Sequence, residues 1–252
     1  MARKKVLQDS RGAKSERPAL HVRSAQAFTA VQRAARGRFR SQIHSSNKVI
    51  HWMRHGQTEM NVHLGSHFTP AEGYEDPLLY DTRLTEEGKA QAVLARVDAK
   101  ALSPKPEVLI TSPLTRALHT AELAFGESLG RPTIVEPTCS ERIWLSSDVG
   151  RQPKELQQDF PMVNFDSLED VWWHNNGSGD VQHILAETPD EFEARMGAFR
   201  MYLRQRPEKV LAVVTHFGVL EHMTGHRFTN CEIWSCLWED GYCSAEHDGI
   251  QL

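Results

Sequence analysis

Short apolar or β-prone runs alternate with segments of helical periodicity along most of this chain. The runs at 49–53, 107–112 and 210–215 are brief and rich in Val, Ile and Leu, which is typical of strands inside a sheet. A weaker run of the same kind lies at 132–137. Because such strands alternate with helices, the pattern predicts an α/β fold in three layers, with a mainly parallel central sheet flanked by helices.

The helices between these runs carry recognisable start signals. In the segment 85–102 a threonine N-cap precedes two glutamates. Directly after the second strand, Ser112 is expected to cap a helix with Pro113 in its first position. A third helix is predicted to begin at Thr188, which forms a capping box with Glu191.

Two segments do not follow this alternation. Residues 1–47 are rich in Arg, Ser and Ala and poor in large apolar side chains, so we expect a largely disordered arm ahead of one domain at 48–252. Residues 143–187 contain two prolines, three glycines and three tryptophans without a regular period. We interpret them as an excursion outside the main layers.

Charge is distributed unevenly between these parts. Residues 1–48 hold twelve Lys and Arg against two acids, whereas the remainder holds 17 against 31. An Arg-rich, acid-poor arm is typical of an organelle transit peptide, so a mitochondrial or plastid location stays open beside a cytoplasmic one. The arm contains no motif that recognises nucleic-acid bases, so we expect no nucleic acid as a partner. No apolar run reaches the roughly 18 residues of a membrane span, so we expect no membrane as a partner.

The cysteines do not predict a metal site. Cys231, Cys236 and Cys243 lie near histidines, but their spacing does not fit structural zinc, and no helical His-Glu-x-x-His pattern is present. We expect unpaired, reduced thiols at these positions and at Cys139, and no metal.

The ends of the expected strands carry the candidate chemistry. The strand at 49–53 leads into Arg-His-Gly at 54–56, and the strand at 210–215 leads into His-Phe-Gly at 216–218. The strand at 107–112 leads into a helix with Arg116 in its first turn. Because the carboxyl ends of strands form the ligand crevice of open α/β sheets, two arginines and two histidines should converge on one rim.

A phosphate between these side chains would relieve their mutual repulsion. Arg54 and Arg116 can each bind phosphoryl oxygens with two N–H groups, and Asn61 can add a neutral donor. Positive charge nearby favours the neutral form of His55, whose lone pair can attack phosphorus.

An alkoxide leaving group needs a proton, and a carboxylic acid beside the pocket can supply it. Glu141 is our candidate, because it follows the weaker strand at 132–137. Asp148 and Asp166 are the alternatives.

Taken together, these motifs resemble the three signatures of the histidine phosphatase superfamily, in its first, phosphoglycerate mutase-like branch. The resemblance rests on Arg-His-Gly-Gln-Thr at 54–58, Ser-Pro-Leu-Thr-Arg-Ala at 112–117 and Thr-His-Phe-Gly at 215–218, and it covers residues 48 to about 240. It implies a sheet flanked by helices and phosphoryl transfer without a metal or cofactor. By motif position it implies that His55 is the phosphorylated nucleophile. The expected catalytic residues are His55, Glu141 and His216, and the expected phosphate-binding residues are Arg54, Thr58, Asn61, Arg116 and Phe217.

We therefore predict a phosphatase that hydrolyses a small phosphomonoester, with a small phosphorylated metabolite as its partner and a homodimer left open. A phosphoglycerate mutase and a non-catalytic phospho-ligand binding or scaffold protein are the alternatives. The resemblance implies that a true mutase has a longer C-terminal tail that closes over the site, whereas 36 residues follow His216 here. This difference favours the phosphatase over the mutase. Selectivity is expected in residues 143–187, where Arg151 and Lys154 could hold a second anionic group and the tryptophans an apolar one.

Overall fold

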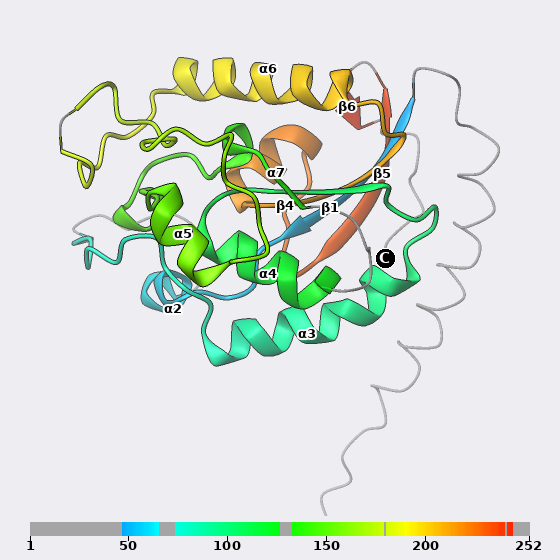
Figure 1. Ribbon diagram of the computed structural model, residues 1–252, viewed down its shortest axis with the longest axis horizontal. Coiled ribbons are helices and arrows are strands. Elements are labelled where there is room, and N and C mark those ends of the chain that lie inside the picture. Colours follow the sequence, from blue (N-terminus) through cyan, green and yellow to red (C-terminus); the bar gives the residue numbers. More distant parts are fainter. Residues whose placement is uncertain (1–46, 66–73, 127–132, 179, 240, 244–252) are drawn as a thin grey trace, which may run out of the picture.

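A computed structural model of the chain describes residues 47–65, 74–126, 133–178, 180–239 and 241–243. They form a six-stranded sheet between two layers of helices (Figure 1), so the predicted three-layer α/β fold is confirmed. The expectations for residues 1–47 fall outside the described residues, apart from Asn47.

The sheet is mixed and mostly parallel. Its strands run in the order β3-β2-β4-β1-β5-β6. β1, β2, β3 and β4 pair in parallel, whereas β5 and β6 add an antiparallel edge. The bounds are Lys48–Arg54 (β1), Val108–Thr111 (β2), Thr133–Val135 (β3), Val210–Thr215 (β4), Ile233–Glu239 (β5) and Tyr242–Cys243 (β6). The four parallel strands therefore end at one common edge.

Helices cover both faces of this sheet. In Figure 1, α6 and α7 lie over one face, and α3 and α4 lie under the other. The helices are Glu59–Leu64 (α2), Glu86–Ala101 (α3), Thr115–Phe125 (α4), Pro153–Asp159 (α5), Pro189–Gln205 (α6) and Phe217–Thr224 (α7), with 3₁₀ turns at Pro137–Cys139 (η2) and Ser146–Asp148 (η3). None of the described helices is long and apolar enough to cross a membrane.

The core has two halves because successive side chains of a strand point to opposite faces. On the α6 and α7 side, Trp52 of β1 is fully buried against Phe199 at a ring-centroid distance of 6.3 Å. On the other side, α3 and α4 present mainly alanines, among them Ala92 and Ala117, both fully buried. Such small side chains let these two helices lie close to the sheet and to each other.

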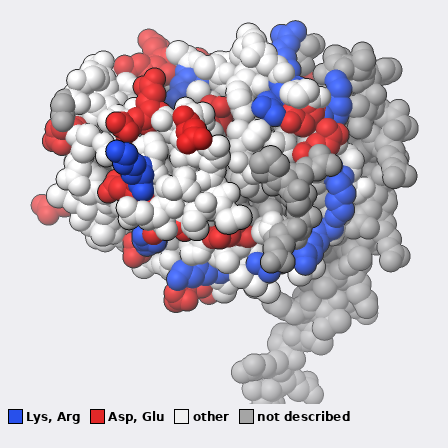
Figure 2. All heavy atoms as spheres, viewed as in Figure 1, with Lys and Arg blue, Asp and Glu red and all other residues white. Residues whose placement is uncertain are grey.

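Charged side chains of both signs are interspersed on the face seen in Figure 2. Exposed ion pairs such as Lys89 with Glu86, at 2.6 Å, contribute only about 0–1 kcal/mol each. The stability of the fold therefore depends mainly on the two halves of the apolar core, one on each face of the sheet.

Two predicted helix starts are confirmed and one is wrong. Thr85 caps α3, and Thr188 forms the predicted capping box of α6. The helix predicted to begin at Pro113 begins instead at Thr115. The carboxylate of Asp81, 34 residues earlier in the chain, accepts the backbone N–H of Thr115 at 2.8 Å and also its hydroxyl. A distant side chain thus satisfies the free N–H group that a local cap would otherwise serve.

The cysteine prediction is wrong for one pair. Cys236 and Cys243 form a disulfide between β5 and β6, with their Cα atoms 5.6 Å apart. The antiparallel pairing of these strands brings the two residues into the range that a disulfide needs. Cys139 and Cys231 are buried free thiols, and the described residues hold no cluster that could ligate a metal.

Gly88 lies where α3 touches the segment after β1. A Cβ atom there would come within 2.0 Å of the carbonyl oxygen of Gln57, which is backbone and cannot turn aside. We expect Gly88→Ala to lower the free energy of unfolding by about 1–3 kcal/mol, measured by chemical denaturation. Gly197 in α6 is the control, because nothing lies within 4 Å of its added Cβ. There, alanine should raise stability by about 0.5–1 kcal/mol, and equal effects of the two substitutions would contradict this reading.

Candidate active site

The carboxyl ends of β1 and β4 place two histidines side by side. Arg54 pairs in register with Thr215, so the residues that follow them, His55 and His216, are neighbours. Their ring centroids are 5.2 Å apart, and both side chains are almost completely buried. Arg116, in the first turn of α4, follows the end of β2, the next strand in the sheet.

The His55 ring is held in one tautomer. Its Nδ1 lies 2.7 Å from the carbonyl oxygen of Gly56, which can only accept, so Nδ1 carries the proton and Nε2 keeps a lone pair. Burial lowers the pKa of His55 well below its usual value, and the charges of Arg116 and Arg54 lower it further. At neutral pH the imidazole is therefore uncharged and able to act as a nucleophile.

Close packing explains the glycines of both histidine motifs. A Cβ on Gly56 would lie 2.6 Å from the carbonyl oxygen of Gly88. A Cβ on Gly218 would lie 2.6 Å from the Oε1 atom of Glu141. Neither position therefore leaves room for a larger side chain unless its neighbours move.

Arg54 is a buried cation in a fixed orientation. Its Nη1 donates to the carbonyl oxygen of Phe228 at 2.8 Å, and its guanidinium lies 5.2 Å from the centre of the Phe217 ring. Burial lowers its pKa to about 10, so it stays charged at neutral pH. Phe217 thus supports Arg54 through its ring, in addition to lining the cavity.

Arg116 is anchored by the turn that carries Asp148. Its Nη1 donates to the carbonyl oxygen of Ser147 at 2.6 Å, and its Nη2 donates to Oδ1 of Asp148 at 2.9 Å. The other oxygen of Asp148 accepts the backbone N–H groups of Trp144 and Leu145. Because its ion pair with Arg116 at 2.9 Å needs an ionised carboxylate, Asp148 is less suited than Glu141 to donate a proton.

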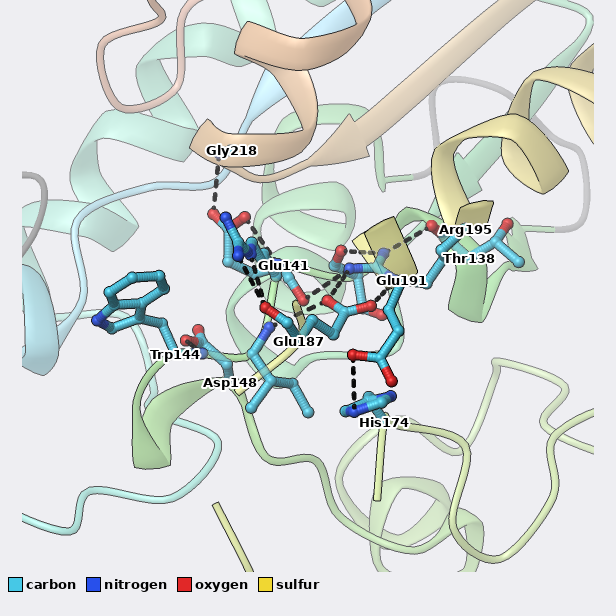
Figure 3. Close-up of polar contacts among 12 residues, drawn as sticks. Thr138, Glu141, Trp144, Asp148, His174, Glu187, Glu191, Arg195 and Gly218 are labelled. Atoms are coloured by element: carbon cyan, nitrogen blue, oxygen red, sulfur yellow. Dashed lines mark hydrogen bonds and ion pairs between the residues drawn. The ribbon is translucent and has the colours of Figure 1, made fainter. Parts of the chain in front are cut away.

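Glu141 follows η2 and faces the start of α7. Its Oε2 accepts the backbone N–H of Gly218 at 3.1 Å, and its Oε1 accepts that of Arg142 at 3.0 Å (Figure 3). Burial, followed by repulsion from Asp148, raises the pKa of Glu141 despite these two donors. Among the three carboxylates considered from the sequence, Glu141 and Asp148 line the cavity, while Asp166 is exposed away from it.

Thr58 and Asn61 form the start of α2. The Thr58 hydroxyl accepts the backbone N–H of Asn61 at 3.1 Å, and Asn61 Oδ1 accepts the backbone N–H of Thr58 at 3.1 Å. The side-chain NH₂ group of Asn61 is then the group left to donate to a ligand. Both residues line the same cavity as the histidine and the arginines.

These side chains surround a cavity of about 780 Å³. Its lining includes the predicted residues Arg54, His55, Thr58, Asn61, Arg116, Glu141 and Phe217. His216 is not in this lining, and its ring lies beside that of His55 at a centroid distance of 5.2 Å. Neither ring nitrogen of His216 has a hydrogen-bond partner among the described residues, although both are buried. Two buried cations, a neutral histidine and a carboxyl group with a raised pKa make this cavity suitable for a phosphate ester.

The sequence between residues 50 and 235 matches the profile of the histidine phosphatase superfamily (branch 1). The chain belongs to this family. It is 30% identical to Phosphoglycerate mutase-like protein 1 of Arabidopsis thaliana, over 77% of this chain and 82% of the relative. It is also 29% identical to a probable phosphatase of Schizosaccharomyces pombe, over 68% of this chain and 74% of that protein.

Solved structures share the family fold. Phosphoglycerate mutase from Bacillus anthracis str. Sterne superposes with a TM-score of 0.51 at 18% identity, covering 79% of this chain and 92% of its own. A putative alpha-ribazole-5'-P phosphatase from Escherichia coli gives 0.50 at 21% identity, covering 78% and 93%. At these identities the likeness concerns the fold.

Within this family fold, the two cations expected to bind a second anionic group lie elsewhere. Arg151 pairs with Asp81 at 2.9 Å and with Asp159 at 2.9 Å, behind the start of α4. Lys154 is exposed on α5. Neither residue lines the cavity. Arg151 belongs to the packing of the excursion, and Lys154 lies on its exposed surface.

The two neighbouring tryptophans also lie away from the cavity. Trp173 is buried, and the ring of Trp172 packs against Gly150, where a Cβ would come within 2.2 Å. These side chains fill the excursion. The part of it that lines the cavity is Trp144, Leu145, Ser147 and Asp148.

A partly buried ion pair that sequence reasoning missed holds the segment carrying Glu141. Arg195 of α6 donates to both carboxylate oxygens of Glu187, at 2.7 and 2.6 Å. The same guanidinium donates to the carbonyl oxygens of Thr138, Ser140 and Glu141 at 2.9, 2.8 and 3.3 Å. Figure 3 shows Arg195 reaching from its helix to this segment.

Sequence reasoning also missed Asn230, which lies far from the Arg-His-Gly motif at 54–56 in the sequence. Its Nδ2 donates to the carbonyl oxygen of His55 at 2.9 Å and approaches Asn61 Oδ1 at 3.4 Å. Since 175 residues separate it from His55, no local pattern could have indicated this contact.

Proposed function

We propose that this protein is a phosphatase that hydrolyses a small phosphomonoester through a phosphohistidine on His55. The observation that carries the proposal is the neutral His55 ring, fixed by the carbonyl oxygen of Gly56 between two buried arginines. The likeness to a probable phosphatase of Schizosaccharomyces pombe supports the hydrolytic direction.

In the first step, the Nε2 lone pair of His55 attacks phosphorus, and the ester P–O bond breaks. Arg54 and Arg116 balance the negative charge of the transferring phosphoryl group. Glu141 gives its proton to the leaving oxygen, so the alcohol departs neutral. The products of this step are phospho-His55, the alcohol and the Glu141 carboxylate.

In the second step, water attacks the phosphorus of phospho-His55. The Glu141 carboxylate takes a proton from that water, the P–N bond breaks, and its electron pair returns to Nε2. Inorganic phosphate leaves, and Glu141 is protonated again. His216 stays neutral because burial, with Arg116 next, lowers its pKa. The neutral ring keeps one N–H without a partner among the described residues, and we assign it to a phosphoryl oxygen of the group bound to His55.

A test of this proposal compares release of phosphate into water with transfer to a second alcohol. The purified protein is incubated with a panel of phosphomonoesters, including 3-phosphoglycerate, and products are followed by ³¹P NMR. Hydrolysis to inorganic phosphate supports the proposal. Isomerisation of the phosphoglycerate without net phosphate release would establish the mutase alternative. Binding without either reaction would establish a scaffold role.

The Arg195–Glu187 pair should matter for the rate because it holds the backbone of Glu141. We expect Arg195→Met to lower kcat for an alkyl phosphate by about 10–100-fold, since small misplacement of a catalytic group is costly. KM should change little, because the phosphate-binding arginines keep their own anchors. Arg204→Met, an exposed position on the same helix, is the control. An equal loss on aryl and alkyl phosphates would assign Arg195 a general structural role.

A further inference from the structure

The cavity extends well beyond the phosphate-binding side chains. Its volume of about 780 Å³ lies in the range that encloses a ligand of several rings, so it has room for the alcohol part of an ester. The lining away from the phosphate-binding side chains includes the following residues, which we call the outer wall: Arg142, Trp144, Pro189, Phe192, Glu193 and Glu221. The composition of this wall indicates which alcohols fit there.

Trp144 is a fixed aromatic surface at the cavity wall. Its side chain is 52% exposed, although it lines the cavity. The Arg142 guanidinium lies 5.3 Å from the Trp144 ring centre and 5.7 Å from that of Phe192. Arg142 is itself fixed, because its Nε and Nη2 both donate to the carbonyl oxygen of Glu187, at 3.1 and 2.7 Å. An exposed indole held in this way is suited to stacking with a ring of a ligand.

The charges of the outer wall do not favour a second anion. Among the described lining residues, Arg142 is the one cationic side chain besides Arg54 and Arg116. Glu193 and Glu221 also line the cavity, and their partners Arg200 and Arg227 lie outside the lining. Glu193 also contacts His222 of the lining at 3.2 Å, but burial lowers the pKa of His222, which disfavours its charged form. A second phosphate or carboxylate on a substrate would therefore lie near the negative charges of Glu193 and Glu221. The guanidinium of Arg142 already donates two of its N–H groups to the carbonyl oxygen of Glu187.

We propose that the outer wall selects phosphomonoesters of uncharged, ring-bearing alcohols and disfavours substrates with a second anionic group, with Trp144 as the stacking residue and Glu193 and Glu221 as the repelling residues. This inference rests on the proposed function and adds the class of alcohol. It separates the protein from a phosphoglycerate mutase, whose substrate carries a carboxylate beside its phosphate.

Three alkyl phosphates with similar leaving groups test the selectivity: ethyl phosphate, 2-phenylethyl phosphate, and the 4-carboxy derivative of the latter. We expect kcat/KM for 2-phenylethyl phosphate to exceed that for ethyl phosphate by about tenfold through stacking and burial of the ring. The carboxy derivative should fall about fivefold below it at low ionic strength, and the gap should shrink in salt. Equal values for the three esters would overturn the proposal.

Variants assign the effects to residues. Trp144→Ala should lower kcat/KM for 2-phenylethyl phosphate much more than kcat/KM for ethyl phosphate, whereas Met162→Ala, 94% exposed and outside the cavity, should change neither. The double variant Glu193→Gln/Glu221→Gln should close the gap between the two ring esters, and Glu169→Gln on the exposed surface should not. A uniform loss on all three esters in Trp144→Ala would make it a structural residue.

Binding of non-hydrolysable phosphonate analogues of the same three esters, measured by calorimetry, separates the two proposals. If no ester is turned over but the phosphonates bind in the expected order, the proposed hydrolysis fails while the selectivity stands. If the esters are hydrolysed but the analogues bind equally, the selectivity fails while the hydrolysis stands.

Discussion

Replacing His55 by alanine should lower phosphatase activity by a factor of about 10⁴ or more, because the atom that accepts the phosphoryl group is lost. Arg54 and Arg116 remain in place, so phosphate esters should still bind. The measurement is kcat on an aryl phosphate, beside an unfolding curve that shows the variant to be folded. Normal turnover by this variant would refute the assigned mechanism.

The covalent intermediate supplies a second readout for His55. Acid-labile, alkali-stable phosphoryl label should be trapped on the wild-type protein quenched during turnover, and peptide mapping should place it on His55. His216→Ala is the matched control: it is slower but keeps Nε2 of His55 and should still be labelled. Label on His216 in the wild-type protein would reverse the roles given to the two histidines.

Replacing Glu141 by glutamine should lower kcat for alkyl phosphates by about 10²–10⁴-fold, because the amide cannot give up a proton to the leaving oxygen. Aryl phosphates, whose leaving groups need little protonation, should lose much less in the first step. The phosphohistidine should then accumulate in Glu141→Gln with an aryl phosphate. Asp148→Asn is the comparison, because it should weaken the anchoring of Arg116 and affect both substrate types.

The pH dependence of the wild-type protein follows from the same carboxyl group. Burial raises the pKa of Glu141, so its proton is kept to a higher pH than in an ordinary glutamate. For alkyl phosphates, kcat should therefore be high below this raised pKa and decline as the pH rises through it. That decline should be absent in Glu141→Gln. A wild-type decline that persists in the variant would assign it to another group.

Much of the fold could be predicted because the parallel strands are short, apolar and closely followed by helices. The convergence of His55, His216 and Arg116 at one edge followed from the rule that strand ends meet there. The register of β1 with β4 in the structure agrees with that expectation, since Arg54 and Thr215 are partners.

The parts that sequence reasoning missed all depend on contacts between distant residues. Asp81 caps α4 from 34 positions away, and Arg195 reaches the carbonyl oxygen of Glu141 across 54. The Cys236–Cys243 disulfide depends on a strand pair, β5 and β6, that no pattern in our reading predicted. Sequence periodicity reports which face of an element is buried, and it does not report which partner covers that face.

The strand order has a consequence for how the chain is made. β1 leaves the ribosome before the other strands that the structure describes, yet its two neighbours in the sheet, β4 and β5, begin only at Val210 and Ile233. Until those residues emerge, both edges of the apolar strand β1 stay unpaired. Unpaired strand edges can pair with other chains, so the nascent chain is prone to aggregation. His55 gains its neighbour His216 only when β4 docks. A partly synthesised chain therefore carries no assembled catalytic centre, and chaperones that shield β1 would be most needed before synthesis is complete.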